Sequence, residues 1–337
     1  MKAPLKAVQI GAGSFARTYH APTLQRLAAA PDPRVVLEGI CDLERQRAEE
    51  FCRDFGYRQA FDDFHLMIET IRPDLIYCMV QPGATAGIVE QLLPLRIPIF
   101  TEKPPGVTLA QAERLASVAR EHGVINAVAF NRRSMPGIQR LKKWAAENGP
   151  IRHARAEMLR NRRLEADFAI GTAIHPLDCL RFLGGEVTHV DTRYTPYPVP
   201  PARDFLVRLA FSSGVIAELA VLVDCGVTRE QYALHLENQL MEVSLGTAYA
   251  CSFCYSGERI FRNNAQVLDD PAPVDPLIAG GFLGEHEAFL EAVLEGKATP
   301  SCLEDAQHSL RLALAVHQGY CGEMSQFVPD PDPVPHA

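Results

Sequence analysis

The chain has 337 residues, which is more than one compact core usually holds, so we expect two domains. Hydrophobic residues make up 47% of the sequence and charged residues 22%, as in ordinary globular proteins, and a formal net charge of −8 argues against a nucleic acid partner. Apolar stretches stay well short of the roughly 20 residues that span a membrane, and Pro4 leads directly into an apolar run without room for a signal peptide, so we expect a cytoplasmic protein with no membrane partner.

Short apolar runs alternate with helical patterns over the first 130 residues. This alternation predicts a parallel, doubly wound sheet with right-handed crossovers. The predicted strands are Leu5–Ile10, Val35–Cys41, Leu75–Val80, Ile97–Phe100 and Asn126–Phe130. The predicted helices are Phe15–Ala29, Leu43–Phe55, Phe64–Ile71, Thr85–Leu93 and Leu109–His122.

The first strand runs into a glycine-rich turn that opens a helix. Gly11, Gly13 and Ala16 fit the pattern G-x-G-x-x-A, and the strand before and helix after them strengthen this short motif. Backbone N–H groups of such a turn bind a pyrophosphate. We expect the turn, including Ser14 and Phe15, to bind a dinucleotide cofactor.

Asp42 ends the second strand, 29 positions after Gly13 instead of the roughly 20 that are usual. We expect its carboxylate to accept hydrogen bonds from the adenosine ribose. Because Glu44 would repel a 2′-phosphate, NAD is favoured, with NADP as the alternative if Arg45 or Arg47 turns toward a phosphate. The other interpretation of Asp42 is a helix N-cap.

Gln81 and Pro82 follow the strand Leu75–Val80, and we expect them on the nicotinamide side of the cofactor. A plain strand-to-helix turn is an equally compatible interpretation.

Lys103 follows the strand Ile97–Phe100, between Glu102 and two prolines. Ligands of parallel sheets bind where strands end. Burial or a neighbouring cation can lower the pKa of a lysine, which could then take the proton of a substrate hydroxyl while the carbon-bound hydrogen leaves as hydride. The alternative is a solvated loop lysine.

Several arginines lie between positions 132 and 163, before the predicted helix Ile174–Phe182. If they turn inward, Arg132, Arg160 and Arg162 would bind a carboxylate or phosphate of the substrate; otherwise they form a solvated face. The same region also holds Arg133, Arg155 and Arg163.

After Gly149 longer strands with β-branched residues appear, and turn signals between them favour antiparallel hairpins. The predicted strands are Ile151–Leu159, Val187–Tyr194, Phe205–Phe211, Val215–Val223, Tyr232–Glu237 and Met241–Leu245, and the predicted helices are Ile174–Phe182, Glu285–Leu294 and Leu303–Gln318. We expect a dinucleotide-binding domain at 1–125, a substrate and oligomerisation domain at 126–328, and a proline-rich disordered tail at 329–337.

His175 opens the helix Ile174–Phe182, and Asp178 lies one turn further on the same face. A helix N-terminus keeps a histidine neutral, which suits hydrogen bonding or proton relay at a substrate. A histidine that caps or packs locally is the alternative.

The nine cysteines lie mostly in apolar segments, as small core residues of a reduced compartment do. Cys251 and Cys254 form a C-x-x-C pair, but the sequence offers no second ligand pair, so no metal is expected.

The chain resembles the Gfo/Idh/MocA family, the group of glucose–fructose oxidoreductase and inositol dehydrogenase. The resemblance covers nearly the whole chain and lies in G-A-G-S-F-A at Gly11–Ala16, Asp42, T-E-K-P-P-G at Thr101–Gly106, F-N-R-R-S-M-P at Phe130–Pro136, H-P-L-D at His175–Asp178 and the segment Gly281–Val293. It implies an N-terminal Rossmann domain and a C-terminal α/β domain with a large, mostly antiparallel sheet whose open face joins a homodimer or homotetramer.

The resemblance also implies NAD(P)-dependent chemistry on a hydroxyl or carbonyl of a sugar, cyclitol or related compound. Lys103 would be the acid/base and contact the substrate, and Glu102 would lie against the nicotinamide ribose. His175 would bind the reacting hydroxyl, and Asp178 would support it or the substrate.

Two positions depart from the family pattern. Gly171 stands where members often have an aspartate four residues before the histidine, and Ala86 stands where they tend to have a histidine. Either Lys103 and His175 suffice, Asp167 or Asp178 substitutes, or the chain does something other than ordinary polyol oxidation. The alternatives are a non-catalytic NAD(P)-binding sensor and an elimination or glycoside-cleaving enzyme that recycles NAD within each turnover.

Overall fold

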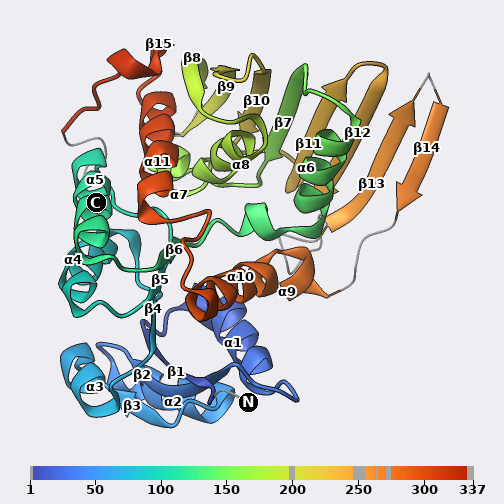
Figure 1. The fold of residues 1–337 in the computed structure, drawn as a ribbon. Helices are drawn as coiled ribbons and strands as arrows, with labels where there is room; N and C mark the ends of the chain where they lie inside the picture. Colours follow the sequence, from blue (N-terminus) through green and yellow to red (C-terminus); the bar gives the residue numbers. More distant parts are fainter. Residues whose placement is uncertain (1–2, 197–201, 246–254, 263–264, 271–274, 332–337) are drawn as a thin grey trace. The chain divides into compact units, whose positions relative to one another are not determined.

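Two units make up the computed structural model (Figure 1): residues 1–129 with 282–307, and residues 130–281 with 308–337. Compared with the expected boundary at residue 125, the first unit extends to Ala129, because the strand Asn126–Val128 pairs within its sheet. It also includes residues 282–307, because Phe289 and Leu290 pack into its core. The structure describes residues 3–196, 202–245, 255–262, 265–270 and 275–331.

The first unit is built on six described strands that pair in parallel, with a helix in each connection. They are β1 (Leu5–Ile10), β2 (Val35–Cys41), β3 (Gln59–Phe61), β4 (Leu75–Cys78), β5 (Ile99–Thr101) and β6 (Asn126–Val128). Their order is β3-β2-β1-β4-β5-β6, which reverses between β1 and β4. The predicted doubly wound Rossmann sheet is confirmed, and ligands of such sheets bind at the reversal, beyond the strand ends.

The helices of this unit follow the predicted pattern closely. They are η1 (a π-helical segment, Ala16–His20), α1 (Ala21–Ala28), α2 (Arg45–Phe55), α3 (Phe64–Ile71), α4 (Pro82–Leu92), η2 (Leu93–Leu95), α5 (Leu109–His122) and α10 (Phe282–Glu295). The bounds of α5 match the prediction because Thr108 and Gln111 form a capping box and Gly123 ends the helix at a φ of +64°. The three-residue strand β3 was not predicted.

The second unit is built on a sheet of nine described strands. They are β7 (His153–Leu159), β8 (Val187–Pro196), β9 (Arg203–Phe211), β10 (Ile216–Leu222), β11 (Arg229–Leu236), β12 (Gln239–Leu245), β13 (Tyr255–Arg262), β14 (Ala265–Asp270) and β15 (Cys321–Glu323). Their order is β14-β13-β12-β11-β7-β10-β9-β8-β15, and the pair β7–β10 is parallel while the other pairs are antiparallel. The expected large, mostly antiparallel sheet is confirmed.

The second unit also contains helical segments. They are η3 (Asn131–Ser134), α6 (Pro136–Asn148), α7 (Phe168–Gly171), α8 (Ile174–Gly184), α9 (Pro276–Ala279), η4 (Met324–Gln326) and α11 (Leu303–His317), which begins in the first unit. Helix α6 packs on β11 and β12, and α8 packs on β7 and β10. Helix α6 was not predicted, although Ile138, Leu141 and Trp144 recur at helical spacing and are buried.

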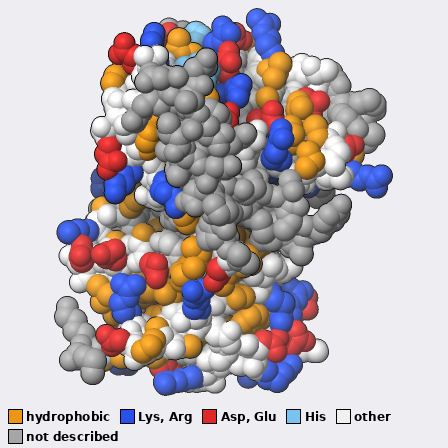
Figure 2. All heavy atoms as spheres, turned by 90° about the vertical axis from the view of Figure 1, so that its right-hand side faces the viewer, with side chains coloured by type: hydrophobic (Ala, Val, Ile, Leu, Met, Phe, Trp, Pro, Cys, Tyr) orange, Lys and Arg blue, Asp and Glu red, His pale blue; other side chains and the backbone are white. Residues whose placement is uncertain are grey.

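Two predicted features, the C-x-x-C pair and the proline-rich tail, lie wholly or partly outside the residues that the structure describes. Cys251 and Cys254 lie outside the described residues, as do residues 332–337 of the proline-rich tail. Among the described helices, none combines the length and apolar character needed to cross a membrane. On the face in Figure 2, acidic and basic side chains are intermixed over the described residues.

Candidate functional site

The glycine-rich turn leaves β1 against the end of β4. Gly11 has a φ of +97°, and a Cβ atom there would lie 2.3 Å from the carbonyl oxygen of Met79. Only glycine fits this contact without a shift of the backbone. At Gly13, by contrast, a Cβ atom would meet open space within 4 Å as far as the described chain goes, and Ser14 and Phe15 are exposed. The turn therefore has room for a ligand to approach its backbone, as a pyrophosphate requires.

Gln9, which the sequence analysis did not single out, holds this turn from inside the sheet. Its Nε2 donates to the carbonyl oxygen of Gly11 at 2.7 Å, and the hydroxyl of Tyr57 donates to its Oε1 at 2.6 Å. Gln9 and Tyr57 are buried. An amide between the apolar residues Val8 and Ile10 was the signal that could have revealed it.

Asp42 lies beside the same turn. Its Oδ2 accepts the backbone N–H of Ala12 at 2.8 Å, and its Oδ1 accepts that of Glu44 at 3.0 Å. The N-cap of α2 is Glu44, so Asp42 does not cap that helix. A carboxylate offers about four acceptor sites; two N–H groups leave capacity for ribose hydroxyls.

Arg45 and Arg47, the two arginines that would favour NADP, are bound to carboxylates. Arg47 pairs with Glu44, and its Nη1 lies 3.7 Å from Asp42 Oδ1. The Nε of Arg45 donates to Glu49 at 3.3 Å.

Gln81 and Pro82 are exposed where β4 leads into α4. Gln81 is the N-cap residue and Pro82 the first residue of the helix, a position that suits proline. The predicted strand-to-helix turn is confirmed, and it lies at the same strand-end edge as the glycine turn because β1 and β4 are parallel neighbours of one sheet; the cofactor contact stays a prediction.

Glu102 and Lys103 follow β5 at that edge too. The N–H of Glu102 donates to the carbonyl oxygen of Cys78 at 3.1 Å, which fixes the strand end. Lys103 is half-buried, and its backbone N–H donates to Glu102 Oε2 at 3.1 Å. The first unit thus brings the glycine turn, Gln81 and Lys103 to one edge of its sheet.

The buried Glu102 carboxylate has a second partner, His20, that the sequence analysis missed. His20 Nε2 lies 2.5 Å from Glu102 Oε1. Burial raises the pKa of Glu102, but the hydrogen bond of His20 and the charge of Lys103 outweigh it and hold that pKa below the usual range. Glu102 is therefore ionised near neutral pH.

His175 and Asp178 lie in the first turns of α8 in the second unit, and both are buried. Both carboxylate oxygens of Asp178 are bound by Arg133, at 2.8 Å from Nε and 2.6 Å from Nη2. The hydroxyl of Ser309 also donates to Oδ1 at 2.6 Å. The His175 ring packs edge-on against Phe130, with ring centroids 6.4 Å apart.

The three candidate anion-binding arginines lie in two different environments. Arg132 and Arg160 are buried, and their guanidinium groups bind Glu230 at 3.1 Å and 2.7 Å. Burial raises the pKa of Glu230, but these two charges outweigh it and lower the pKa to about 2. Arg162 is exposed and has a φ of +53°.

Asp167 approaches the place of the aspartate that the family pattern leads one to expect. Its Oδ2 lies 3.5 Å from where a Cβ atom on Gly171 would be. The side chain at position 167 thus brings a carboxylate beside Gly171.

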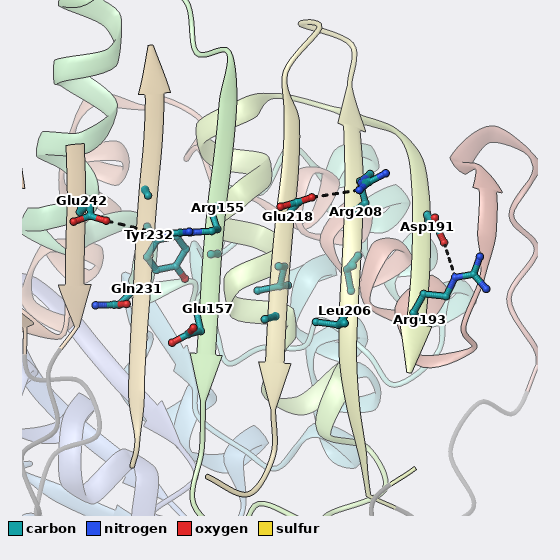
Figure 3. A pocket seen from close by; sticks show the side chains of 15 residues that line it. Arg155, Glu157, Asp191, Arg193, Leu206, Arg208, Glu218, Gln231, Tyr232 and Glu242 are labelled. Carbon is teal, nitrogen blue, oxygen red and sulfur yellow. Dashed lines mark hydrogen bonds and ion pairs between the residues drawn. The ribbon is translucent and has the colours of Figure 1, made fainter. Parts of the chain in front are cut away.

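The face of the second sheet opposite α6 and α8 carries a hollow of about 530 Å³ (Figure 3). Charged side chains pair across it: Arg155 of β7 with Glu242 of β12 at 3.9 Å, Arg208 of β9 with Glu218 of β10 at 3.4 Å, and Arg193 with Asp191, both on β8, at 3.5 Å. Leu206 lies among them and is 59% exposed.

The profile of an oxidoreductase family with an NAD-binding Rossmann fold, GFO_IDH_MocA, matches residues 5–130. Inositol 2-dehydrogenase of Paracoccus denitrificans is 30% identical over 236 residues, which cover 66% of this chain and 68% of that protein. Myo-inositol 2-dehydrogenase of Thermotoga maritima is 26% identical over 187 residues, which cover 52% of this chain and about half, 54%, of that protein. A solved dehydrogenase structure from Chromobacterium violaceum shares the fold, with a TM-score of 0.83 at 18% identity over 95% of this chain and 96% of that one. The chain belongs to the Gfo/Idh/MocA family of oxidoreductases with an NAD-binding Rossmann fold.

Proposed function

We propose that the protein is an NAD(P)-dependent oxidoreductase acting on a hydroxyl or keto group of a sugar, cyclitol or related compound. The observation that carries this proposal is the position of Lys103 at the strand-end edge that also holds the glycine turn and Asp42. The glycine turn and Asp42 would hold the dinucleotide, which would supply a nicotinamide as the hydride acceptor for the carbon that bears the reacting hydroxyl. Lys103 accepts the proton of that hydroxyl, so that the carbon–oxygen bond becomes a carbonyl.

In this mechanism His175 orients the reacting oxygen from the second unit. We assign Asp178 to the support of helix α8, since Arg133 and Ser309 bind its carboxylate. Family members often have an aspartate at the position of Gly171, and here we assign its role to Asp167. The carboxylate of Asp167 beside Gly171 supports this assignment.

We propose NAD as the preferred cofactor. Asp42 holds the adenosine ribose, and Glu44 repels a 2′-phosphate. Two ion pairs support this preference: Arg45 pairs with Glu49, and Arg47 pairs with Glu44. Each guanidinium would have to leave its carboxylate before it could bind a 2′-phosphate.

An anionic group on the substrate would bind Arg162. Arg132 and Arg160 bind Glu230, so we assign them to the packing of the second unit. Turnover of neutral and acidic sugars tests this point, and equal turnover of both removes the anionic preference.

The test of the function is NADH formation from NAD⁺ with a panel of inositols, aldoses and sugar acids. We expect turnover of at least one, and Lys103→Met should cut it by about 10²-fold or more while cofactor binding persists. Lys142→Met, on the exposed part of the chain outside the proposed site, is the matched control. Cofactor binding without turnover of any compound would favour the sensor, and product without NADH accumulation would favour the elimination or cleavage reaction.

We propose further that a second copy of this chain covers the open sheet face in Figure 3 and forms a homodimer, from which a homotetramer can be built. The face supports this because it carries paired charges of both signs around the exposed Leu206, which suits a self-complementary interface. Light scattering should report a dimer that Leu206→Glu dissociates, while Leu43→Glu on the first unit leaves it intact. A cytoplasmic location remains part of the proposal, and cell fractionation tests it.

A further inference from the structure

Three buried side chains of the first unit, Glu102, His20 and His286, form a hydrogen-bonded chain. His20 Nε2 lies 2.5 Å from Glu102 Oε1, and His20 Nδ1 lies 2.8 Å from His286 Nε2. Both histidines are 0% exposed. They come from η1 and α10, which lie 266 positions apart at these residues, so the chain exists only because α10 packs into this unit.

The surroundings of His286 determine where the protons lie. Burial and the neighbouring His20 hold the pKa of His286 well below its usual value, so this ring is neutral. Phe100 stacks on it at 4.7 Å, and its Nδ1 has no hydrogen-bond partner within the described residues. With its one proton on Nε2, His286 donates to His20 Nδ1, and His20 in turn donates from Nε2 to the ionised Glu102.

The same region holds the donor types of a metal site, since His20, His286 and Glu285 have ligand atoms within 4.8 Å of one another. Two nitrogen ligands of a tetrahedral zinc ion, at bonds of about 2.0–2.1 Å, stand about 3.3 Å apart. The 2.8 Å between the facing nitrogens of His20 and His286 is instead a hydrogen-bond distance. The geometry therefore favours the hydrogen-bonded chain.

We propose that His20 is a positioning residue that fixes the Glu102 carboxylate for cofactor binding, and that His286 locks the His20 ring in the donating tautomer. The inference rests on the proposed function for the role of Glu102 at the nicotinamide ribose. The inference adds two residues, His20 and His286, that have no part in the proposed function itself. They act on the cofactor through Glu102.

Loss of His20 has a pH-dependent consequence. Burial raises the pKa of Glu102, and without the hydrogen bond of His20 the lowering influences that remain come from Lys103. Glu102 would then take up a proton at a higher pH, lose its charge and bind the ribose less well on the acid side. The titratable groups that face this chain are Lys103 beside it, Tyr77 and Cys78 on β4, and Glu285 on α10.

Fluorescence titration of NADH binding from pH 5 to 9 tests the proposal in the full-length protein. His20→Leu removes the donor at similar volume, whereas His20→Gln keeps an N–H donor near the place of Nε2. We expect binding by His20→Leu to weaken toward pH 5 relative to pH 9, by up to about tenfold for each unit by which the pKa of Glu102 rises. His20→Gln should follow the wild-type profile, and His286→Leu should fall between the two.

The Glu102→Gln background separates positioning from a structural role. If His20 acts through Glu102, His20→Leu should add little loss in that background. The proposal is overturned if His20→Leu lowers NADH affinity equally in the wild-type and Glu102→Gln backgrounds. It is also overturned if His20→Leu and His20→Gln lower NADH affinity alike and by the same factor at every pH. Stoichiometric metal in the purified protein whose removal reproduces the His20→Leu profile would overturn it too.

Two further observations keep the test decisive. If His20→Leu does not fold, long-range nitrogen–proton NMR of the wild type reports the His20 tautomer, and a proton on Nδ1 instead of Nε2 contradicts the proposal. A wild-type protein that binds no NADH removes the proposed function. Normal NADH binding that His20→Leu leaves unchanged removes this inference alone.

Discussion

The carboxylate of Asp167 lies 3.5 Å from the position that a Cβ atom on Gly171 would occupy. An aspartate at position 171 would start from that Cβ atom, so the two positions can deliver a carboxylate to the same neighbourhood of α7 and α8. We expect Asp167→Asn to reduce turnover about tenfold or more, which corresponds to about 1.4 kcal/mol of barrier.

Gly171→Asp provides the matched rescue. Combined with Asp167→Asn it returns a carboxylate from the neighbouring position and avoids placing two charges together, so steady-state kinetics should show recovered kcat. Glu165→Gln, on the same loop, is the control and should retain wild-type turnover. Full activity of Asp167→Asn alone would mean that Lys103 and His175 suffice.

Gly11 and Gly13 should separate folding from cofactor binding. Gly11→Ala places a Cβ atom 2.3 Å from the carbonyl oxygen of Met79 at a φ of +97°, so we expect a loss of about 1–3 kcal/mol in the free energy of unfolding. Gly13→Ala meets open space among the described residues and should leave stability unchanged while weakening NADH binding, because the second glycine lets the backbone approach the pyrophosphate. Chemical denaturation and NADH titration of both variants check this, and equal stability of the two would contradict it.

Asp42 should determine the choice of cofactor. Asp42→Ala removes charge-assisted hydrogen bonds worth about 1.5–3 kcal/mol, so NAD affinity should fall roughly 10- to 100-fold. NADP affinity should fall much less, because the charge of Asp42 adds to the repulsion of the 2′-phosphate by Glu44, and that part of the repulsion is lost at the same time. Glu44→Ala, an exposed neighbour, should change NAD binding little; calorimetry that finds equal losses for both cofactors after Asp42→Ala would refute the assignment.

Glu230 should contribute strongly to the stability of the second unit. Glu230→Gln leaves Arg132 and Arg160 buried without their counter-charge, so we expect a loss of about 3–5 kcal/mol in the free energy of unfolding. Glu90→Gln, which breaks an exposed pair with Arg114, is the control and should cost about 1 kcal/mol or less.

The pH dependence of stability gives a second readout for Glu230. Its folded pKa of about 2 lies below the unfolded value of about 4.3, so the folded state binds fewer protons in this range. The contribution of Glu230 is therefore complete above about pH 4.3 and is lost as the pH falls toward 2. Denaturation between pH 2 and 7 should show a shallower acid loss in Glu230→Gln than in the wild type; parallel curves would contradict the assignment.

The sequence by itself determined the local elements. The bounds of β1, β2, α3 and α5 follow from runs of apolar residues, caps and glycine turns, which act between residues close in the chain. The same local signals located the glycine turn, Asp42 and Lys103, because parallel strands bring all their carboxyl ends to one edge. Helix α6 has an equally clear helical spacing of apolar residues, although it was not predicted.

Only the tertiary structure decided which distant side chains meet. The pairing of His20 with Glu102 and His286 depends on α10 returning to the first unit, and the pairing of Arg132 and Arg160 with Glu230 depends on β11 lying beside β7. An arginine has the same local signature whether it faces solvent or a buried carboxylate. Strand order and helix packing, which sum many weak contacts across the whole chain, made that choice.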